Sequence, residues 1–253
     1  MRDAQSEFSH EELIAIEWAA IHAWPALKNR DIDGWLWRYS GGGSQRANSV
    51  SPIAFHGTDV EEAIDEAERL YFSQSAASRF RVFDTLSQPA DLDQRLEARG
   101  YKITESVLTL AKRVGACSSP LDVRFLDQPS DGWMEVYLSN IAADRRPAAP
   151  SLLALVPQPR TYFTVEVDGQ VISTGLGVRC GNVVIAECIG TRQEARRTGG
   201  ASRVMTALEA WAKVQGASIV ALQAVTTNFP AQQLYAALGY TKIGGLHYRV
   251  RER

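Results

Sequence analysis

Three strand-like segments joined by tight turns lie in the second half of the chain, and they constrain the fold more than any other feature. Residues 161–167 and 171–178 are joined by Asp168-Gly169, a dipeptide typical of two-residue β-hairpin turns. Gly181-Asn182 then turns the chain into a third segment, residues 183–189. The sequence therefore predicts an antiparallel meander in this region.

Helices and strands alternate after the predicted meander. A helix is expected at about residues 201–216, because apolar residues recur along one of its faces. Residues 219–225 form a near-continuous apolar run, which is typical of a parallel strand covered on both faces. A short helix at residues 228–238 and one or two closing strands at residues 241–250 complete the pattern.

The first half of the chain alternates in the same way. Ser9 and Glu12 form a capping box that opens a first helix, and Thr58 and Glu61 form a second one. Strands are expected at residues 35–39, 47–53, 80–85 and 101–112, and further helices at residues 58–74 and 89–100. The predicted fold class is α/β with mixed α+β character, in which each half has a twisted mixed β-sheet flanked by helices.

Residues 113–121 are small and polar, which places a domain boundary there and gives two domains, residues 1–115 and 120–253. Residues 91–101 and 231–240 share one pattern, because each ends a helix on Gly-Tyr and then enters a strand. This repeated unit predicts that the two domains are related.

The composition of the chain excludes several classes of function. A formal net charge of −2 argues against a protein that binds nucleic acid by neutralising phosphates, since such domains are usually basic. No apolar run approaches the roughly 20 residues that span a bilayer, and residues 1–10 are too polar and acidic for a secretory signal. The cysteines and histidines lack the spacing of disulfides or metal ligands. We therefore expect a cytoplasmic protein without a metal, either a monomer or a homodimer.

A glycine-rich turn at residues 196–201 opens the helix that follows the meander. Glycine lets the backbone come close to a phosphate, and the unpaired amides at a helix N-terminus favour an anion. The turn lacks the Gly-Lys-Ser/Thr ending of a Walker A loop and does not match Gly-x-Gly-x-x-Gly. On its own it indicates either an anion-binding site or a helix that begins after a flexible loop.

The order of motifs in residues 120–250 resembles the GNAT superfamily of N-acetyltransferases. The resemblance rests on Thr191-x4-Arg196-x-x-Gly199-x-Ala201, then a helix, a buried strand and Asn228-x6-Tyr235-x3-Gly239-Tyr240. It implies tandem GNAT-like domains, of which the second is active. It also implies direct transfer of acetyl from acetyl-CoA, as co-substrate, to a primary amine of a small molecule or peptide. No metal or acyl-enzyme takes part in that reaction.

The resemblance assigns cofactor-binding roles to particular residues. In that family the glycine-rich turn binds the pyrophosphate of acetyl-CoA through backbone amides, and here Arg196 would support the turn. The residues implied to bind are Arg197, Thr198, Gly199, Gly200, Ala201 and Ser202. Ala201 stands where many members have glycine.

The family's strand before this turn pairs with the pantetheine arm, and here that segment is Ile189, Gly190 and Thr191. The cleft would open between this strand and residues 219–225. Asn228, at the mouth of that cleft, resembles the family's side-chain ligand to the same arm.

Two residues are candidates for proton transfer. Tyr235 matches the position of a common tyrosine general acid in the family, and a phenol can protonate the leaving CoA thiolate. The alternative is an aromatic residue that packs on a short helix. Glu187 lies four residues before Thr191, where some members carry a general base, and it is the only acidic residue on its strand. The alternative for Glu187 is a glutamate at the sheet edge or facing solvent.

The first half departs from the family pattern. Leu96 stands where Tyr235 stands in the second half, and no glycine-rich turn precedes it. We therefore expect a degenerate GNAT-like domain without cofactor binding. Residues 37–49 resemble a signature beside GNAT domains in some two-domain bacterial members. Its arginines and Asn48 would help to shape the acceptor pocket, or else the segment is a hairpin with charged flanks.

Two other functions are compatible with the sequence. A degenerate acyl-CoA-binding sensor or interaction module would use the same turn, and CoA binding without turnover of any amine would favour it. A nucleotide-binding protein would also use the turn, and a preference for ATP over CoA would favour that. The acceptor itself cannot be identified from the sequence, because acceptor pockets are built from variable loops.

Overall fold

The computed structural model describes residues 7–116 and 118–253. The first half contains α1 (His10–Ala23), β1 (Lys28–Ile32), β2 (Trp35–Tyr39), the 3₁₀ turn η2 (Arg46–Asn48), α2 (Val60–Ser73), β3 (Ser78–Phe83), α3 (Leu92–Ala98) and β4 (Lys102–Arg113). The second half contains β5 (Val123–Leu126), α4 (Asp131–Ser139), η3 (Ala143–Arg145), α5 (Ala149–Ala154), β6 (Arg160–Val167), β7 (Gln170–Cys180), β8 (Val183–Thr191), η4 (Gln193–Ala195), α6 (Gly200–Val214), β9 (Ile219–Val225), α7 (Phe229–Ala237) and β10 (Thr241–Arg251).

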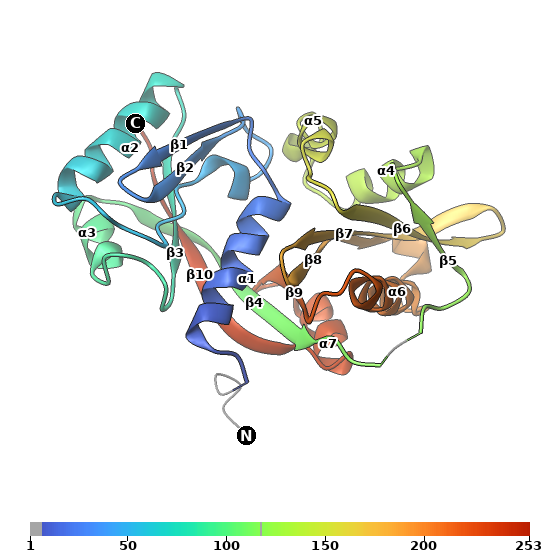
Figure 1. The fold of residues 1–253 in the computed structure, drawn as a ribbon. Helices are drawn as coiled ribbons and strands as arrows, with labels where there is room; N and C mark the ends of the chain where they lie inside the picture. The colour runs from blue at the N-terminus through green and yellow to red at the C-terminus, as the bar shows by residue number, and fades with distance from the viewer. Residues whose placement is uncertain (1–6, 117) are drawn as a thin grey trace.

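One eight-stranded sheet runs through both halves, in the order β3-β10-β4-β9-β8-β7-β6-β5. β4, from the first half, lies between β9 and β10. β4 and β10 cross the middle of the molecule side by side (Figure 1). All neighbours in the sheet are antiparallel except β8 and β9, which run parallel. The mixed fold class with a helix-flanked sheet is confirmed, but the two halves share this sheet instead of having one each.

The repeated Gly-Tyr unit introduces the two strands that join the halves. Gly100 and Gly239 follow α3 and α7, and both have a φ of 84°, the left-handed conformation that glycine adopts without strain. Each glycine therefore ends its helix, and a long strand, β4 or β10, begins after it. These two strands pair with each other. β4 continues the sheet of the second half at β9, and β10 continues that of the first half at β3. β3 and β4 of the first half correspond to β9 and β10 of the second half. Exchanging the halves therefore reverses the order β3-β10-β4-β9 and leaves the pairing pattern unchanged.

Two apolar cores lie on opposite faces of the sheet, and β9 contributes to both. Ile219 and Ala221 belong to the core that includes α1, whereas Val220 and Leu222 belong to the core that includes α6. A strand covered on both faces needs apolar side chains at successive positions. This double burial is why residues 219–225 form a continuous apolar run.

Two local predictions differ from the structure. Asp59, not Thr58, caps α2, and its carboxylate accepts hydrogen bonds from two backbone amides of the first turn. Both residue types are good caps, so the pattern could not choose between neighbours. Residues 47–53 do not form the expected strand; β2 pairs with β1, and residues 47–53 contact β2 through one isolated bridge. The capping box of Ser9 and Glu12 is confirmed.

The predicted domain boundary, residues 113–121, falls between the end of β4 and the start of β5. Cys117, one of the three cysteines considered from the sequence, lies outside the described residues. Because strands on both sides of the boundary belong to one sheet, the division into residues 1–115 and 120–253 stays a prediction.

An ion pair joins the start of α1 to the end of β4 and makes stability depend on pH. Arg113 donates to both carboxylate oxygens of Glu12, at 2.5 and 2.8 Å, and the Ser9 amide donates to the same carboxylate. The hydrogen bonds from Arg113, together with that from Ser9, lower the pKa of Glu12 from 4.5 to about 2. A carboxyl with a depressed folded pKa stabilises the fold above its unfolded pKa, and this contribution is lost as the pH falls through the folded value.

We therefore expect Glu12→Gln to lower the free energy of unfolding at about pH 6 and to have less and less effect as the pH falls from about 4.5 towards 2. Urea denaturation at a series of pH values measures the difference between the two proteins. Glu11→Gln, at an exposed neighbour in the same turn, is the control. A Glu12→Gln effect that stays constant down to about pH 3 would contradict this origin of the pKa shift.

Candidate active site

The two parallel strands at the centre of the second half separate before they end. β8 and β9 pair only from Val183 opposite Ile219 to Ile185 opposite Ala221. Beyond these pairs, β8 continues to Thr191 and β9 continues to Val225, but the two strands no longer pair with each other. The separation predicted between these strands is therefore present.

A bulge in β8 lies where the two strands have separated. Leu176 of β7 faces Glu187, but the next matched pair is Thr174 with Gly190, so two residues of β8 lie opposite Gly175 alone. One of the two, Cys188, has a φ of 54°, which bends the strand at this point. The Gly175 carbonyl is satisfied by a hydrogen bond of 3.0 Å from the indole Nε1 of Trp133, so the bulge leaves no buried carbonyl unpaired there.

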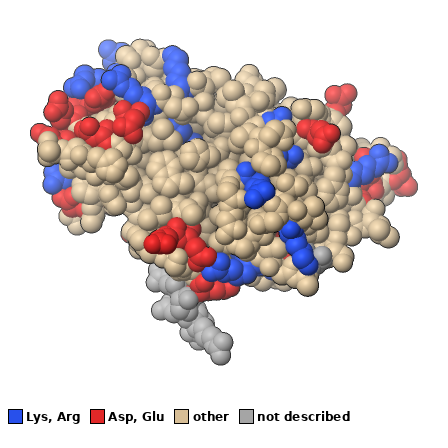
Figure 2. All heavy atoms as spheres, in the orientation of Figure 1, with Lys and Arg blue, Asp and Glu red and all other residues tan. Residues whose placement is uncertain are grey.

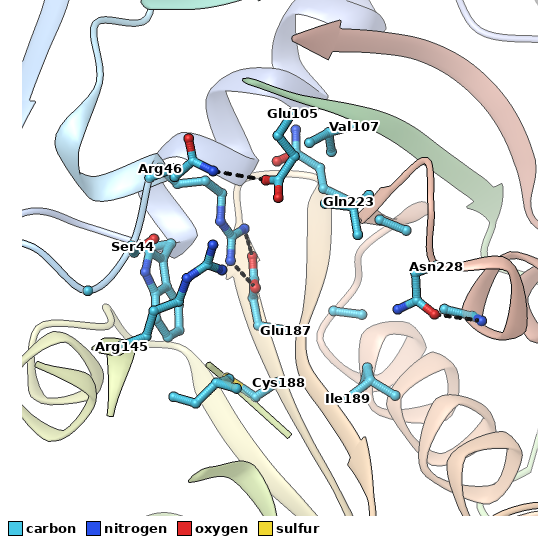
Figure 3. Close-up of a pocket in the computed structure, with 18 of the residues that line it drawn as sticks. Ser44, Arg46, Glu105, Val107, Arg145, Glu187, Cys188, Ile189, Gln223 and Asn228 are labelled. Atoms are coloured by element: carbon cyan, nitrogen blue, oxygen red, sulfur yellow. Dashed lines mark hydrogen bonds and ion pairs between the residues drawn. The ribbon is translucent and has the colours of Figure 1, made fainter. Parts of the chain in front are cut away.

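A cavity of about 330 Å³ occupies the space between the separated strands and the first half (Figure 3). From the second half it is lined by the ends of β8 and β9, by α7 and by residues before and within α5. From the first half it is lined by Trp24, residues 43–46, Glu105 and Val107. The sequence places every candidate catalytic residue in the second half, whereas the cavity that contains them is built by both halves.

The glycine-rich turn follows β8 after the short turn η4 and leads into α6. Arg196 ends the 3₁₀ turn η4, and Arg197 and Gly199 have left-handed φ angles of 65° and 82°. Gly199 is the N-cap residue of α6 and provides no side-chain cap, so the first amides of the helix are not satisfied in this way. Gly200 packs on β7, where a Cβ atom would lie 2.1 Å from the Ser173 Oγ atom. The turn therefore presents bare backbone amides at the end of the strand predicted to bind pantetheine.

In the first half, the start of α2 corresponds to the start of α6, but it is capped and negatively charged. The Asp59 carboxylate caps α2 by accepting hydrogen bonds from the amides of Glu61 and Glu62, at 2.9 and 3.2 Å. Two more carboxylates, those of Glu61 and Glu62, lie in the same turn. A helix start that is already occupied by an anion and surrounded by negative charge does not attract a phosphate.

Tyr235 and Asn228 both line the cavity from α7. Burial, with a further contribution from the negative charge of Glu187, raises the pKa of Tyr235 above its usual value. Its hydroxyl makes no hydrogen bond with any residue in the described part of the chain, so it is available to a ligand. The Asn228 side chain caps α7 by accepting from the Ala231 amide at 3.3 Å, which leaves its NH₂ group as a donor.

Glu187 is held by an arginine from the other half of the chain. Arg46 donates to both of its carboxylate oxygens, at 2.5 and 2.7 Å (Figure 3), and the Glu187 side chain is 7% exposed. Burial alone would lower the pKa of Arg46, but attraction to Glu187 outweighs it and the pKa of Arg46 is raised. The guanidinium also lies over the ring of Trp24, 5.3 Å from its centroid. Glu187 is therefore neither at the sheet edge nor facing solvent.

The loop that presents Arg46 is fixed by two polar side chains of the same segment. Arg38, buried, donates to the carbonyls of Ile21 and Trp24 at the end of α1 and to the Arg46 carbonyl. Asn48 accepts a hydrogen bond from the Ser40 amide and donates to two carbonyls of the loop between them. These bonds explain why the segment forms a 3₁₀ turn instead of a strand. Arg46 lines the cavity, whereas Arg38 and Asn48 hold its loop. That the segment shapes the acceptor pocket stays a prediction.

Replacing one member of the Arg46–Glu187 ion pair is expected to lower the free energy of unfolding more than replacing both members. Arg46→Met leaves the Glu187 carboxylate almost buried without its cation, which should lower the free energy of unfolding by about 3 kcal/mol. Arg46→Met combined with Glu187→Gln should recover a large part of that loss, because no charge is then buried alone. Urea denaturation of the single and double variants measures both values. Additive losses in the double variant would show that the two side chains do not stabilise each other.

Several residues of the cavity carried no signal in the sequence. Glu105 lies within β4, Arg145 ends the turn η3, and Gln223 lies within β9, so no motif surrounds them. Cys188 also lines the cavity, and burial together with the neighbouring Glu187 charge raises the pKa of its thiol. A protonated thiol is a poor nucleophile, and direct transfer without an acyl-enzyme stays a prediction.

Two further observations concern the described part of the chain as a whole. None of its helices is both long and apolar enough to cross a membrane. It contains no group of three or more His, Cys, Asp and Glu side chains placed to hold a metal ion.

Solved structures with this fold include acetyltransferases that superpose on nearly the whole chain. The GCN5-related N-acetyltransferase from Kribbella flavida gives a TM-score of 0.71 at 16% identity and covers 95% of this chain and 96% of its own. A tandem GNAT protein from the clavulanic acid biosynthesis pathway gives a TM-score of 0.65 at 11% identity, over 96% of both chains. The uncharacterized N-acetyltransferase YobR of Bacillus subtilis is 27% identical over 95% of this chain and 99% of its own length.

The fold and these relatives define the protein as an N-acetyltransferase of the GNAT superfamily. The probable histone acetyltransferase Rv0428c of Mycobacterium tuberculosis is 30% identical over 51% of this chain and 40% of its own length. The chain belongs to the family described as the C-terminal part of that protein, whose family model matches residues 11–251.

Proposed function

We propose that the protein transfers acetyl from acetyl-CoA directly to a primary amine of a small molecule or peptide. The observation that carries this proposal is the single cavity between the separated ends of β8 and β9, into which both Tyr235 and Glu187 face. Acetyl-CoA is then a co-substrate, and no metal takes part.

The proposed binding mode follows the path from the glycine-rich turn to the cavity. The backbone of Arg197 to Ser202, at the uncapped start of α6, binds the pyrophosphate, and Arg196 supports the turn. Ile189, Gly190 and Thr191 lie along the pantetheine arm as an added strand, and Asn228 donates its NH₂ group to the same arm. The bulge at Cys188 directs the backbone of β8 towards the thioester carbonyl.

The proposed chemistry needs two proton transfers. An alkylammonium has a pKa near 10.4, so its nucleophilic form costs roughly 4–5 kcal/mol at neutral pH. Glu187 accepts this proton directly or through water, while Arg46 orients the carboxylate. The amine then attacks the thioester carbon, the carbon–sulfur bond breaks, and Tyr235 donates its proton to the CoA thiolate. The nitrogen releases its second proton to solvent as the amide forms, and the Tyr235 phenolate takes up a proton from solvent. The raised pKa of Tyr235 keeps that proton on the phenol at neutral pH.

We also propose a division of labour between residues 1–115 and residues 120–253. The second domain binds the donor. The first is a degenerate GNAT-like domain that has lost cofactor binding, which the anion-capped start of α2 supports, and it supplies Arg46 to the acceptor side of the cavity. A cytoplasmic location fits a CoA-dependent enzyme whose described cysteines, Cys180 and Cys188, are both free thiols.

Calorimetry with acetyl-CoA and a coupled assay for amine-dependent release of CoA test the proposal together. Micromolar binding with release that depends on an amine is the expected result. Binding without release for any amine would favour the acyl-CoA sensor instead. Binding of ATP in preference to acetyl-CoA would favour a nucleotide-binding protein.

A further inference from the structure

Four charged side chains line the cavity, and two of them have no partner of opposite charge. Arg46 and Glu187 satisfy each other. Among the residues that the structure describes, Glu105, half-buried on β4, accepts one hydrogen bond, from the side-chain amide of Gln45 at 3.3 Å. Arg145, half-buried at the end of η3, makes no ion pair or side-chain hydrogen bond with any residue in the described part of the chain.

The two unpaired charges come from different walls of the cavity. Glu105 comes from the central sheet, whereas Arg145 comes from the segment that precedes α5 in the second half. In Figure 3 the Arg46–Glu187 pair lies between them, and the guanidinium of Arg145 points towards that pair. The cavity therefore has an unpaired carboxylate on one side of the pair and an unpaired guanidinium on the other.

We propose that the acceptor is a small amine that also carries a carboxylate, of the amino-acid class. Arg145 binds the carboxylate, in the two-pronged geometry that a guanidinium favours. The amine, which arrives as an ammonium group, lies against Glu105 and Glu187. This inference rests on the proposed function and specifies its acceptor.

The charge balance of the cavity selects against other acceptors. Two arginines and two glutamates sum to zero, so a zwitterion leaves the occupied cavity neutral. A polycationic acceptor, such as a lysine-rich peptide, would add positive charge beside Arg145 with nothing to offset it, and an unpaired buried charge is costly. A phosphorylated amine would leave excess negative charge beside the two carboxylates.

The size of the cavity limits the acceptor as well. Its volume of about 330 Å³ is at the small end for ligand sites. Asn228 and Tyr235, which face the donor in the proposed function, line the same space. The acceptor shares this volume with the end of the pantetheine arm, so it must be compact.

The test compares amines that differ only in the carboxylate. Coupled release of CoA gives kcat/KM for the proteinogenic amino acids and for their decarboxylated counterparts, such as lysine with 1,5-diaminopentane and phenylalanine with phenethylamine. We expect the carboxylate to raise kcat/KM roughly ten- to hundredfold for the preferred acceptor, the effect of one strong charge-assisted contact. In Arg145→Gln this ratio should fall to near one, and Arg145→Lys should give an intermediate ratio.

A matched control separates the guanidinium of Arg145 from general effects on its segment. Arg146 is the next residue, exposed and outside the cavity, and Arg146→Gln should keep the wild-type ratio. Calorimetry with acetyl-CoA on every variant verifies that the donor site is intact.

The outcomes distinguish this inference from the proposed function. A wild-type protein that does not bind acetyl-CoA would overturn the proposed function itself. A protein that binds acetyl-CoA but prefers the decarboxylated amines or a polyamine, or that acetylates no amino acid, would overturn the inference about the acceptor. A carboxylate preference that persists in Arg145→Gln would also overturn it, because the recognising group would then lie elsewhere.

Discussion

Replacing Gly199 by glutamate is expected to weaken acetyl-CoA binding at least about 100-fold, which corresponds to roughly 2.7 kcal/mol. Gly199 has a φ of 82°, and this left-handed conformation costs a residue with a side chain about 1–2 kcal/mol. The new carboxylate would also lie at the uncapped start of α6, where it would occupy the helix amides and repel a pyrophosphate. Isothermal titration of acetyl-CoA into the wild type and the variant measures the change.

The opposite end of the same helix provides the control. Gly216 has a φ of 75°, and as at Gly199 nothing lies within 4 Å of the position a Cβ atom would take. Gly216→Glu therefore introduces similar backbone strain and the same charge, but away from the proposed pyrophosphate site. We expect it to bind acetyl-CoA like the wild type. Equal loss of binding in both variants would indicate a folding defect, and unchanged binding in Gly199→Glu would contradict the assignment of the turn.

The parts of the fold that could be predicted have local causes. The hairpin between β6 and β7 was signalled by Asp168-Gly169, and both residues adopt the positive φ angles, 50° and 77°, that such a turn requires. The glycine-rich turn was similarly visible because its glycines serve a backbone conformation and a close approach at adjacent positions. Hydrophobic periodicity gave most helices and strands for the same reason, since it depends only on neighbours along the chain.

The parts that could not be predicted depend on residues that are distant in sequence. Arg46 and Glu187 are 141 residues apart, and neither lies in a pattern that names the other. The insertion of β4 between β9 and β10 likewise depends on which strands meet, because periodicity shows only which face of a strand is buried. The repeated Gly-Tyr unit was visible in the sequence, but it indicated related halves and not that they share one sheet.

The shared sheet changes how the candidate site should be understood. β4 pairs with β9 from Val107 opposite Val225 to Arg113 opposite Ile219, so it supports the strand that forms one wall of the cavity. Glu105 lies on the same β4, and Arg46 reaches Glu187 from the turn η2 of the first half. The second half therefore depends on the first for a sheet neighbour as well as for charged groups at the site.

Replacing Tyr235 by phenylalanine is expected to lower kcat about 100- to 1000-fold, the usual contribution of a positioned general acid. The substitution removes only the hydroxyl, so the KM for acetyl-CoA should change little, because the proposed contacts of the donor lie mainly on the backbone of β8 and α6. Burial raises the pKa of Tyr235, and an acid with a raised pKa loses its proton only as the pH rises through that value. The wild type should therefore show no decline of kcat from this residue below about pH 10.

Tyr240 provides the matched control for this prediction. Its ring packs edge-on against that of Tyr235 with centroids 6.0 Å apart, but it does not line the cavity. Tyr240→Phe should therefore keep kcat within a few-fold of the wild type, because the same change is made one side chain away from the proposed chemistry. Steady-state kinetics with a saturating amine, measured for both variants, decide the matter. If Tyr235→Phe retains wild-type kcat, the thiolate obtains its proton elsewhere, and Tyr235 serves only to pack α7 against the sheet.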